Sequence, residues 1–519
     1  MNTIDFLTIA SAICPDRDCL VFEGRRRTYA QLNERVNRLS NVLSNMGVGK
    51  GDRVGILQVN CPQYVEAYFA AAKVGAIFVP LNFRARAEEL TFLINHSGIK
   101  ILLLGTRYAD MVNPLLCQLP SVKECISIDQ DTEGTDSYEK CLGTACADEF
   151  CNPIEDDDVT ILMFTSGTTK RPKGVPLRHN AFATYILDNV EPASPEIEER
   201  NLLTVPLYHV AGIQALLAAI YGGRTLVLMR QFEAREWMET VQREQVTRAM
   251  LVPTMLKRII DDPDFSKYNL SSLKIITYGA APMPFEVIQK AIKVLPGVRF
   301  INAFGQTETA STITMLGPED HILEGTEEEK EKKLKRLACS IGRPLPDIEV
   351  KIADKDGNCL TAFEVGEICA RGPRIMTGYW QDEQQSTQVL TPDGWLRTGD
   401  MGWRDEEGYI FLAGRGDDMI IRGGENISPE EVESVLHSHP KVEEAAVIAV
   451  PDPEWGQEPR AVIVLKKGET ATTEEMMEFC RTRLAGFKRP RSVVFVDSLP
   501  RTPMGKVLKK TLREKFGKP

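Results

Sequence analysis

A segment rich in hydroxyl groups, glycine and lysine, TSGTTKRPKG (residues 165–174), directly follows the apolar run VTILMF (residues 159–164). Backbone N–H groups, hydroxyls and ammonium groups at the end of a strand can bind the oxygens of a phosphate. The segment is not a Walker A loop, because that pattern closes its glycine-rich turn with Gly-Lys and then Ser or Thr. A surface loop could have the same composition, so other motifs are needed to distinguish a phosphate-binding segment from a surface loop.

Two further segments carry groups suited to a nucleotide. In FGQTE (residues 304–308) Glu308 is a hard oxygen ligand of the kind that Mg²⁺ prefers, and Thr307 can donate to a phosphate oxygen. Phe304 offers a flat face to a purine, and the small residues at 279–281 leave room for backbone to approach the base. A core aromatic side chain is the alternative reading of Phe304.

Two segments nearer the C-terminus add charge. Asp400 closes the triplet TGD and could accept hydrogen bonds from both hydroxyls of a ribose, with Arg415 fifteen residues further on. A surface salt bridge between Asp400 and Arg415 is the alternative. Lys506 follows Gly505 in a proline-bearing segment, where a lysine is ordinarily just solvated.

Alternating patterns predict the elements that position these groups. From about residue 28 to 304, short β-branched runs such as RVGILQV (53–59), GAIFVPL (75–81) and VRFINAF (298–304) alternate with amphipathic segments. This alternation is typical of βαβ units, so the predicted fold class is α/β with mostly parallel sheets packed with helices. After residue 346 shorter strands and turns indicate a β-rich subdomain, and after residue 417 the pattern fits a small α+β domain.

Taken in order, six motifs resemble the adenylate-forming superfamily of acyl-CoA synthetases, nonribosomal adenylation domains and luciferases. They are TSGTTKRPKG, YGAAP (278–282), FGQTE, TGD, GRGDDMIIRGGENISPEEVE (414–433) and PRTPMGK (500–506). The resemblance covers nearly the whole chain. It implies a large N-terminal adenylation domain (1–415), a small mobile C-terminal domain (416–519) that carries the catalytic lysine, and an active site between them.

The resemblance also implies roles for individual residues. Lys506 would neutralise charge on the carboxylate and the α-phosphate, acting with Thr307, Glu308 and His209, and Glu308 would bind Mg²⁺. Asp417 matches the hinge position. The implied ATP-binding residues are Thr165, Ser166, Gly167, Thr168, Thr169, Lys173, Gly279, Ala280, Ala281, Asn302, Phe304, Asp400 and Arg415.

Two departures from family patterns bear on the acid. Acetate-activating members carry tryptophan before the QTE triplet, where this chain has Gly305, so we expect an open slot and an acid larger than propionate. Amino-acid-activating members carry an aspartate in the segment that here reads PLYHVAG (206–212), and none is present. His209 resembles a pocket-wall histidine of aryl- and acyl-CoA ligases, with a packed core histidine as the alternative. The expected acyl pocket is His209, Val210, Gly212, Tyr278, Ala303 and Gly305, with Tyr278 as its hydroxyl.

The acceptor is expected to be CoA. The segment IRGGENI (421–427) resembles the one past which CoA ligases lead the pantetheine arm, and Arg422, Gly423, Gly424 and Lys488 are the expected CoA contacts. Solvated lysines are the alternative for the basic tail. Acyl transfer to a phosphopantetheinyl carrier protein is the rival function, although no carrier domain is present in the 519 residues, and a luciferase-type oxygenase is a third. Medium-chain aliphatic, alicyclic and aromatic acids stay open, and so does the oligomeric state, a homodimer included.

Composition limits the remaining classes. The net charge of −11 makes a nucleic-acid binder improbable, although residues 481–519 carry a net +10 where an anion would be drawn. Twelve scattered cysteines without a CxxC pair indicate reduced thiols. The N-terminus lacks the basic segment of a signal peptide, and no apolar stretch is long enough to span a membrane. We therefore expect a cytoplasmic protein, and the family resemblance implies an enzyme that uses ATP, Mg²⁺ and CoA.

Overall fold

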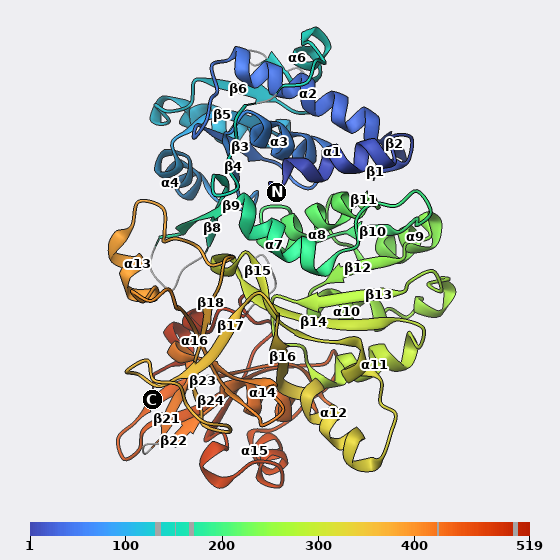
Figure 1. Cartoon of the computed structure of the whole chain (residues 1–519). Helices are drawn as coiled ribbons and strands as arrows, with labels where there is room; N and C mark the ends of the chain where they lie inside the picture. The colour runs from blue at the N-terminus through green and yellow to red at the C-terminus, as the bar shows by residue number, and fades with distance from the viewer. Residues whose placement is uncertain (130–135, 151, 166–170, 423–424, 502–506, 519) are drawn as a thin grey trace.

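The fold is taken from a computed structural model of the chain, which describes residues 1–129, 136–150, 152–165, 171–422, 425–501 and 507–518. In this part of the chain three sheets form (Figure 1). In Figure 1 the seven-stranded sheet with α2–α6 lies at the top, the β10–β14 part of the large sheet lies below it, and the C-terminal strands lie at the bottom. The predicted α/β class is confirmed.

The seven-stranded sheet carries the first chemical motif. Its strands pair in parallel except for the antiparallel pair β8 and β9, which flanks the TSGTT segment. In spatial order they are β7 (Asp136–Ser137), β6 (Glu124–Ser127), β5 (Ile99–Leu104), β3 (Arg53–Leu57), β4 (Ile77–Pro80), β8 (Val159–Thr165) and β9 (Lys173–Arg178).

The thirteen-stranded sheet carries the next motifs. Its run from β14 to β1 is parallel, and its run from β17 to β15 is antiparallel. Of the antiparallel strands, β17 to β20 follow residue 346 and correspond to the predicted β-rich subdomain. In spatial order the strands are β17 (Glu349–Ala353), β18 (Gly366–Arg371), β19 (Leu396–Arg404), β20 (Ile410–Arg415), β16 (Ser340–Pro344), β15 (Ser311–Leu316), β14 (Arg299–Gln306), β13 (Ile275–Gly279), β12 (Arg248–Leu251), β10 (Arg200–Leu203), β11 (Thr225–Leu228), β1 (Asp18–Phe22) and β2 (Arg25–Thr28).

A third, five-stranded sheet begins directly after β20. The chain leaves the large sheet at Arg415, makes the 3₁₀ turn η6 (Gly416–Asp418), and enters the small sheet at Ile420. The strands of this sheet are β22 (Glu425–Ile427), β21 (Ile420–Arg422), β24 (Gly456–Leu465), β23 (Val442–Asp452) and β25 (Ser492–Phe495), the last paired with β24.

Helices cover the sheets because their sequences place apolar residues on one face. Thr28 and Gln31 form a capping box that starts α2. The nearly all-apolar α8 is buried in one core together with α1 and α3, where the rings of Phe6 and Tyr221 lie 5.1 Å apart. The helices are α1 (Ile4–Ile13), α2 (Tyr29–Asn45), α3 (Pro62–Lys73), α4 (Ala87–Ser97), α5 (Ala109–Val112), α6 (Tyr138–Thr144), α7 (His179–Asn189), α8 (Val210–Tyr221), α9 (Ala234–Glu244), α10 (Pro253–Ile260), α11 (Phe285–Val294), α12 (Glu327–Cys339), α13 (Glu383–Val389), α14 (Pro429–His437), α15 (Thr473–Arg481) and α16 (Lys509–Phe516).

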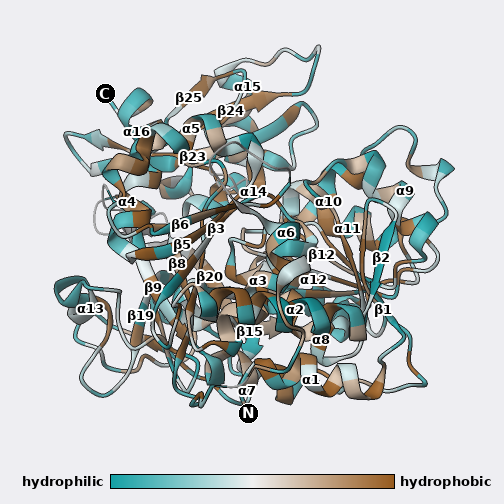
Figure 2. Ribbon diagram, turned by 90° about the horizontal axis from the view of Figure 1, so that it is seen from above, coloured by the Kyte–Doolittle hydropathy of each residue, from teal (hydrophilic) through white to brown (hydrophobic). Residues whose placement is uncertain are grey.

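The hydropathy of the elements follows their position. Figure 2 shows mostly apolar strands such as β3, β5 and β8 inside, and largely polar helices such as α9 and α13 at the periphery. Each sheet supplies apolar residues to a buried cluster. In the described part of the chain, no helix combines the length and the apolar character needed to cross a bilayer.

Candidate active site

The phosphate-binding candidate is held by a strand pair. The backbones of Thr165, the last residue of β8, and Lys173, the first of β9, are paired in the antiparallel register. Ser166, Gly167, Thr168 and Thr169 lie outside the described residues. The ammonium group of Lys173 lies 4.7 Å from the centre of the Tyr379 ring, within the range of a cation–π contact.

Glu308 contacts the hydroxyl of the same tyrosine. It belongs to the 3₁₀ turn η4 (Thr307–Thr309) after β14, and its side chain is buried. The Tyr379 hydroxyl donates to Oε1 of Glu308 over 3.0 Å. A buried carboxylate suits Mg²⁺, which takes one or two protein carboxylates and otherwise water and phosphate oxygens. The described residues contain no cluster of three or more side chains that could hold a metal by themselves.

The nucleotide-base candidates lie at the carboxyl ends of β13 and β14, where ligands commonly bind in parallel sheets. Gly279 is paired with Ala303, and a Cβ at Gly279 would lie 2.2 Å from the Ala303 carbonyl oxygen, so only glycine allows this approach. Ala280 has a φ of +65°, a strained conformation for alanine. Asn302 donates its side-chain amide to the Ser340 carbonyl over 3.3 Å.

The ribose candidates are on adjacent strands. Asp400 on β19 is buried, and its backbone is paired with that of Arg415 on β20. The backbone N–H of Asp400 donates to the Thr398 hydroxyl over 3.1 Å, and the Gln306 side chain reaches the Thr398 carbonyl at 3.5 Å. The TGD strand is therefore tied to the FGQTE segment, in agreement with a shared site.

His209 is the residue that precedes α8, at its N-cap position. Its Nε2 is buried, and among the described residues it has no hydrogen-bond partner. Burial, together with the nearby Arg84 guanidinium, lowers the pKa of His209 to about 3. His209 is therefore neutral at physiological pH, and its buried Nε2 can bond a group brought by a ligand.

The structure corrects the expectation that Tyr278 supplies a hydroxyl to the acyl group. Its side chain is only 1% exposed and belongs to a buried apolar cluster, with its hydroxyl 2.9 Å from Nε2 of His321. Nδ1 of His321 lies 2.7 Å from the Gly317 carbonyl, so Nδ1 carries the proton and Nε2 accepts from Tyr278. Successive side chains of a strand point to opposite faces of its sheet, and Tyr278 lies on the face of β13 that packs against the core.

Two glycines of the expected acyl pocket have a structural explanation. A Cβ at Gly305 would lie 1.7 Å from the Ser311 carbonyl oxygen, at an irregularity in the β14–β15 register. A Cβ at Gly212 would lie 2.6 Å from the Pro206 carbonyl. The approach of β15 accounts for glycine at position 305 without a substrate, and the interpretation of Gly305 as the end of an open acyl slot stays a prediction. The membership of Gly305 in the pocket wall, with Val210 and Ala303, stays a prediction too.

The C-terminal candidates are partly described. Lys506, Gly423 and Gly424 lie outside the described residues, and Asp417 is placed by its backbone in η6. The Arg422 guanidinium lies over the Trp455 ring at 4.8 Å. The Lys488 ammonium forms an ion pair with Glu431 at 2.8 Å, so any contact with CoA phosphates would have to compete with that carboxylate.

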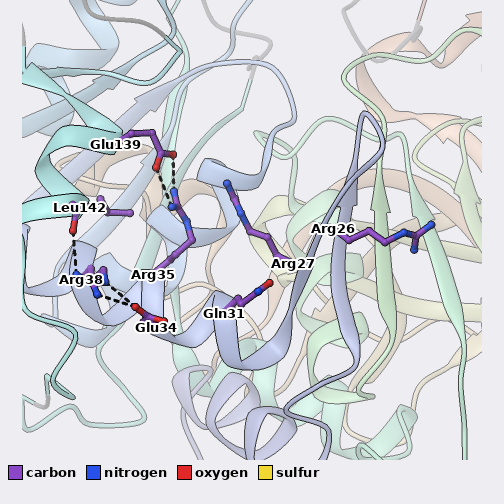
Figure 3. A pocket seen from close by; sticks show the side chains of 9 residues that line it. Arg26, Arg27, Gln31, Glu34, Arg35, Arg38, Glu139 and Leu142 are labelled. Carbon is purple, nitrogen blue, oxygen red and sulfur yellow. Dashed lines mark hydrogen bonds and ion pairs between the residues drawn. The ribbon is translucent and has the colours of Figure 1, made fainter.

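A pocket of about 530 Å³ opens elsewhere, between α2 and α6 (Figure 3). It contains none of the predicted site residues. Its arginines are paired with carboxylates: Arg35 with Glu139 and the buried Glu66, and Arg38 with Glu34. Its positive charge is therefore largely neutralised by the protein.

Comparison with known proteins shows the family to which the chain belongs. The profile of the AMP-binding enzyme family matches residues 8–380, and that of the AMP-binding enzyme C-terminal domain matches residues 431–506. A feruloyl-CoA synthase of Amycolatopsis sp is 36% identical, covering 95% of each chain. The fatty acid–[acyl-carrier-protein] ligase ScoC of Streptomyces coeruleorubidus is 32% identical, covering 97% of this chain and 94% of its own. The crystal structure of the anthranilate CoA ligase AuaEII with anthranoyl-AMP superposes with a TM-score of 0.90 at 26% identity, covering 100% and 97% of the two chains.

The fold and the site thus define an adenylate-forming enzyme, as the motifs predicted. The chain belongs to the AMP-binding enzyme family. The predicted class of AMP-forming acid–thiol ligase is confirmed at this level. Sequence reasoning missed Tyr379 and His321, because neither lies in the motifs that carried the resemblance.

Proposed function

We propose that the chain activates a carboxylic acid larger than propionate and transfers the acyl group to CoA. The observation that carries the adenylation step is that Tyr379 contacts both Lys173 and Glu308, which brings the phosphate segment and the FGQTE segment to one place. The paired backbones of Asp400 and Arg415 add the candidates for the ribose.

In the first half-reaction a carboxylate oxygen of the acid attacks the α-phosphorus of ATP in line, and the bond to pyrophosphate breaks. Lys173 and the TSGTT segment would bind the phosphate oxygens, and Lys506 would offset the charge that develops at the α-phosphate. Glu308 would hold Mg²⁺, which when bound supplies positive charge beside the phosphates. Bringing the acid and ATP together in one orientation accounts for part of the rate.

In the second half-reaction the CoA thiolate attacks the acyl carbonyl of the mixed anhydride, and AMP leaves with the bonding electrons. We propose that residues 1–415 and 416–519 act as two domains, with Asp417 as the hinge between the arrangements for the two steps. The change of sheet between Arg415 and Ile420 supports this boundary.

The nature of the acid is inferred from the pocket wall. Val210 and Ala303 are apolar, and the neutral His209 offers one buried nitrogen, which together suit an apolar acyl group with at most one polar contact. Aromatic and medium-chain acids both meet this description, and the feruloyl-CoA synthase among the relatives supports the aromatic class.

The deciding experiment measures pyrophosphate release by the purified protein with ATP, Mg²⁺ and a panel of aliphatic, alicyclic and aromatic acids, with and without CoA. We expect acid-dependent release and an acyl-CoA product. Release without acyl-CoA formation, followed by loading of a phosphopantetheinyl carrier protein, would favour the second candidate function, which the similarity to ScoC supports. Absence of release with every acid would contradict both.

A further inference from the structure

Tyr379 lies between the two charged groups of the proposed phosphate site. It follows β18 in the segment that leads to α13, and it contacts Glu308 with its hydroxyl and Lys173 with its ring. In the parts of the chain that the structure describes, no ion pair joins Lys173 and Glu308 directly. Lys173 contacts the ring of Tyr379, and Glu308 contacts its hydroxyl, so one side chain links the two charged groups.

Backbone contacts hold this segment in place at both ends. The N–H of Met376 donates to the carbonyl of Glu308 over 2.9 Å, and the N–H of Trp380 donates to the carbonyl of Gly174 over 2.8 Å. One end of the segment is therefore fixed to η4 and the other to β9, one residue after Lys173. Residues 376–380 therefore bridge the FGQTE motif, which contains Glu308, and the phosphate motif, which contains Gly174.

A further contact fixes Tyr379 itself. Its backbone N–H donates to the Ser386 hydroxyl on α13 over 2.8 Å, and that hydroxyl in turn donates to the Asp382 carbonyl over 2.6 Å. The phenol is thus carried by a backbone that several hydrogen bonds hold in place. A fixed donor can orient a carboxylate by occupying one of its oxygens, which leaves the other for a different partner.

The two contacts serve one chemical purpose. An ammonium group and a carboxylate that pair with each other are less available to a phosphate and a cation, because a ligand must first break the pair. A cation–π contact holds the ammonium group without neutralising it. A ring contact would leave the Lys173 ammonium group available to a phosphate, and the hydroxyl contact occupies one oxygen of Glu308.

We propose that Tyr379 is a positioning residue for the phosphate end of the site, which orients Glu308 through its hydroxyl and keeps Lys173 from pairing with Glu308 through its ring. The inference rests on the proposed function for the roles of Lys173 and Glu308. It adds separate roles for the two parts of the side chain: the hydroxyl orients the proposed metal ligand Glu308, and the ring holds the proposed phosphate ligand Lys173.

Two substitutions separate the two parts. Tyr379→Phe removes the hydroxyl and keeps the ring, and Tyr379→Leu removes both. Binding of Mn²⁺ in the presence of ATP is measured by electron paramagnetic resonance, with Mn²⁺ in place of Mg²⁺, and binding of ATP without a divalent cation is measured by calorimetry. Tyr268→Phe, a tyrosine outside the site, is the matched control.

For Tyr379→Phe we expect Mn²⁺ affinity to fall about tenfold, the size of a lost hydrogen bond to a charged group, while ATP affinity without metal stays unchanged. For Tyr379→Leu we expect both affinities to fall, because Lys173 can then pair with Glu308. Adding Glu308→Gln to the Leu variant should restore metal-free ATP affinity, since the competing carboxylate has been neutralised. A merely structural role would not give this restoration.

Ser386→Ala gives an independent test that leaves the charged groups and the phenol intact. By loosening the backbone of Tyr379 it should weaken Mn²⁺ binding in the same direction as Tyr379→Phe, but less. Unchanged Mn²⁺ and ATP affinities in both Tyr379 variants would overturn the inference. A wild-type protein that binds Mn²⁺ with ATP but never forms an acyl-adenylate would instead contradict the proposed function alone.

Discussion

The Nζ of Lys257 on α10 lies 2.8 Å from Oε1 of Glu443 on β23. This ion pair joins a helix from the first 415 residues to the five-stranded C-terminal sheet. Both side chains are partly exposed, and Lys257 also pairs with Asp261 at 2.9 Å. A pair of this kind contributes about 0.2–1 kcal/mol. It can therefore favour this arrangement of the two parts without locking it.

Reversing one charge should shift the balance between arrangements. In Glu443→Lys the attraction becomes a repulsion, and we expect the ratio of the two half-reaction rates to change by roughly two- to fivefold. Single-turnover kinetics of each half-reaction measures this ratio. Glu478→Lys, which affects an exposed pair with Arg481 inside the C-terminal part, is the control. An unchanged ratio would mean that the Lys257–Glu443 pair has no part in the alternation.

Loss of the proposed catalytic lysine should affect one step only. Lys506→Ala is expected to slow adenylation by about 10²- to 10³-fold, because an electrostatic stabiliser of the developing charge is removed, and to spare thioester formation from supplied acyl-adenylate. The exposed Lys510 on α16 provides the control variant Lys510→Ala. Equal losses in both half-reactions would argue against the assigned role.

Gly305 tests the close approach of β14 and β15. Because a Cβ there meets the Ser311 carbonyl, Gly305→Ala should cost about 1–3 kcal/mol of stability and lower activity on all acids alike. Gly297→Ala is the matched control, since a Cβ at Gly297 meets nothing within 4 Å. Thermal unfolding and a chain-length series of acids measure the two effects. A selective loss of the longer acids in a stable Gly305 variant would support the pocket interpretation.

His321 predicts an effect of pH on stability. Burial lowers its pKa to about 4, below the value of about 6.5 expected for an unfolded chain. Below pH 6.5 the unfolded state binds a proton at His321 that the folded state does not. The free energy of unfolding therefore decreases as the pH falls from about 6.5 to about 4. His321→Gln should be less stable at pH 7 but lose less of its melting temperature over this interval. A pH dependence identical to that of the wild type would show that His321 titrates normally.

Asp417 tests the need for rotation between the half-reactions. Proline fixes φ near −65°, which fits the 3₁₀ turn η6 in which Asp417 lies. Asp417→Pro should therefore preserve the described arrangement and slow, by orders of magnitude, the half-reaction that needs another one. Single-turnover kinetics gives the rates, and circular dichroism checks the fold. Near-normal rates of both halves in a folded variant would mean that no rotation occurs about this residue.

The order of the motifs and the alternation of strands and helices could be read from the sequence, because local patterns specify elements and short motifs specify chemistry. The α/β class was predictable in this way, and so was the proximity of the FGQTE and TGD motifs, which the structure joins through Gln306 and Thr398. Only the tertiary structure decided which groups surround each side chain. Tyr278 could face ligand or core until the packing of β13 placed its hydroxyl on His321, and the approach of β15 gives Gly305 a reason to be glycine that the sequence alone did not show. Tyr379 joins Lys173 to Glu308 across separations of 206 and 71 residues in the chain, and such contacts follow from long-range packing that no local pattern records.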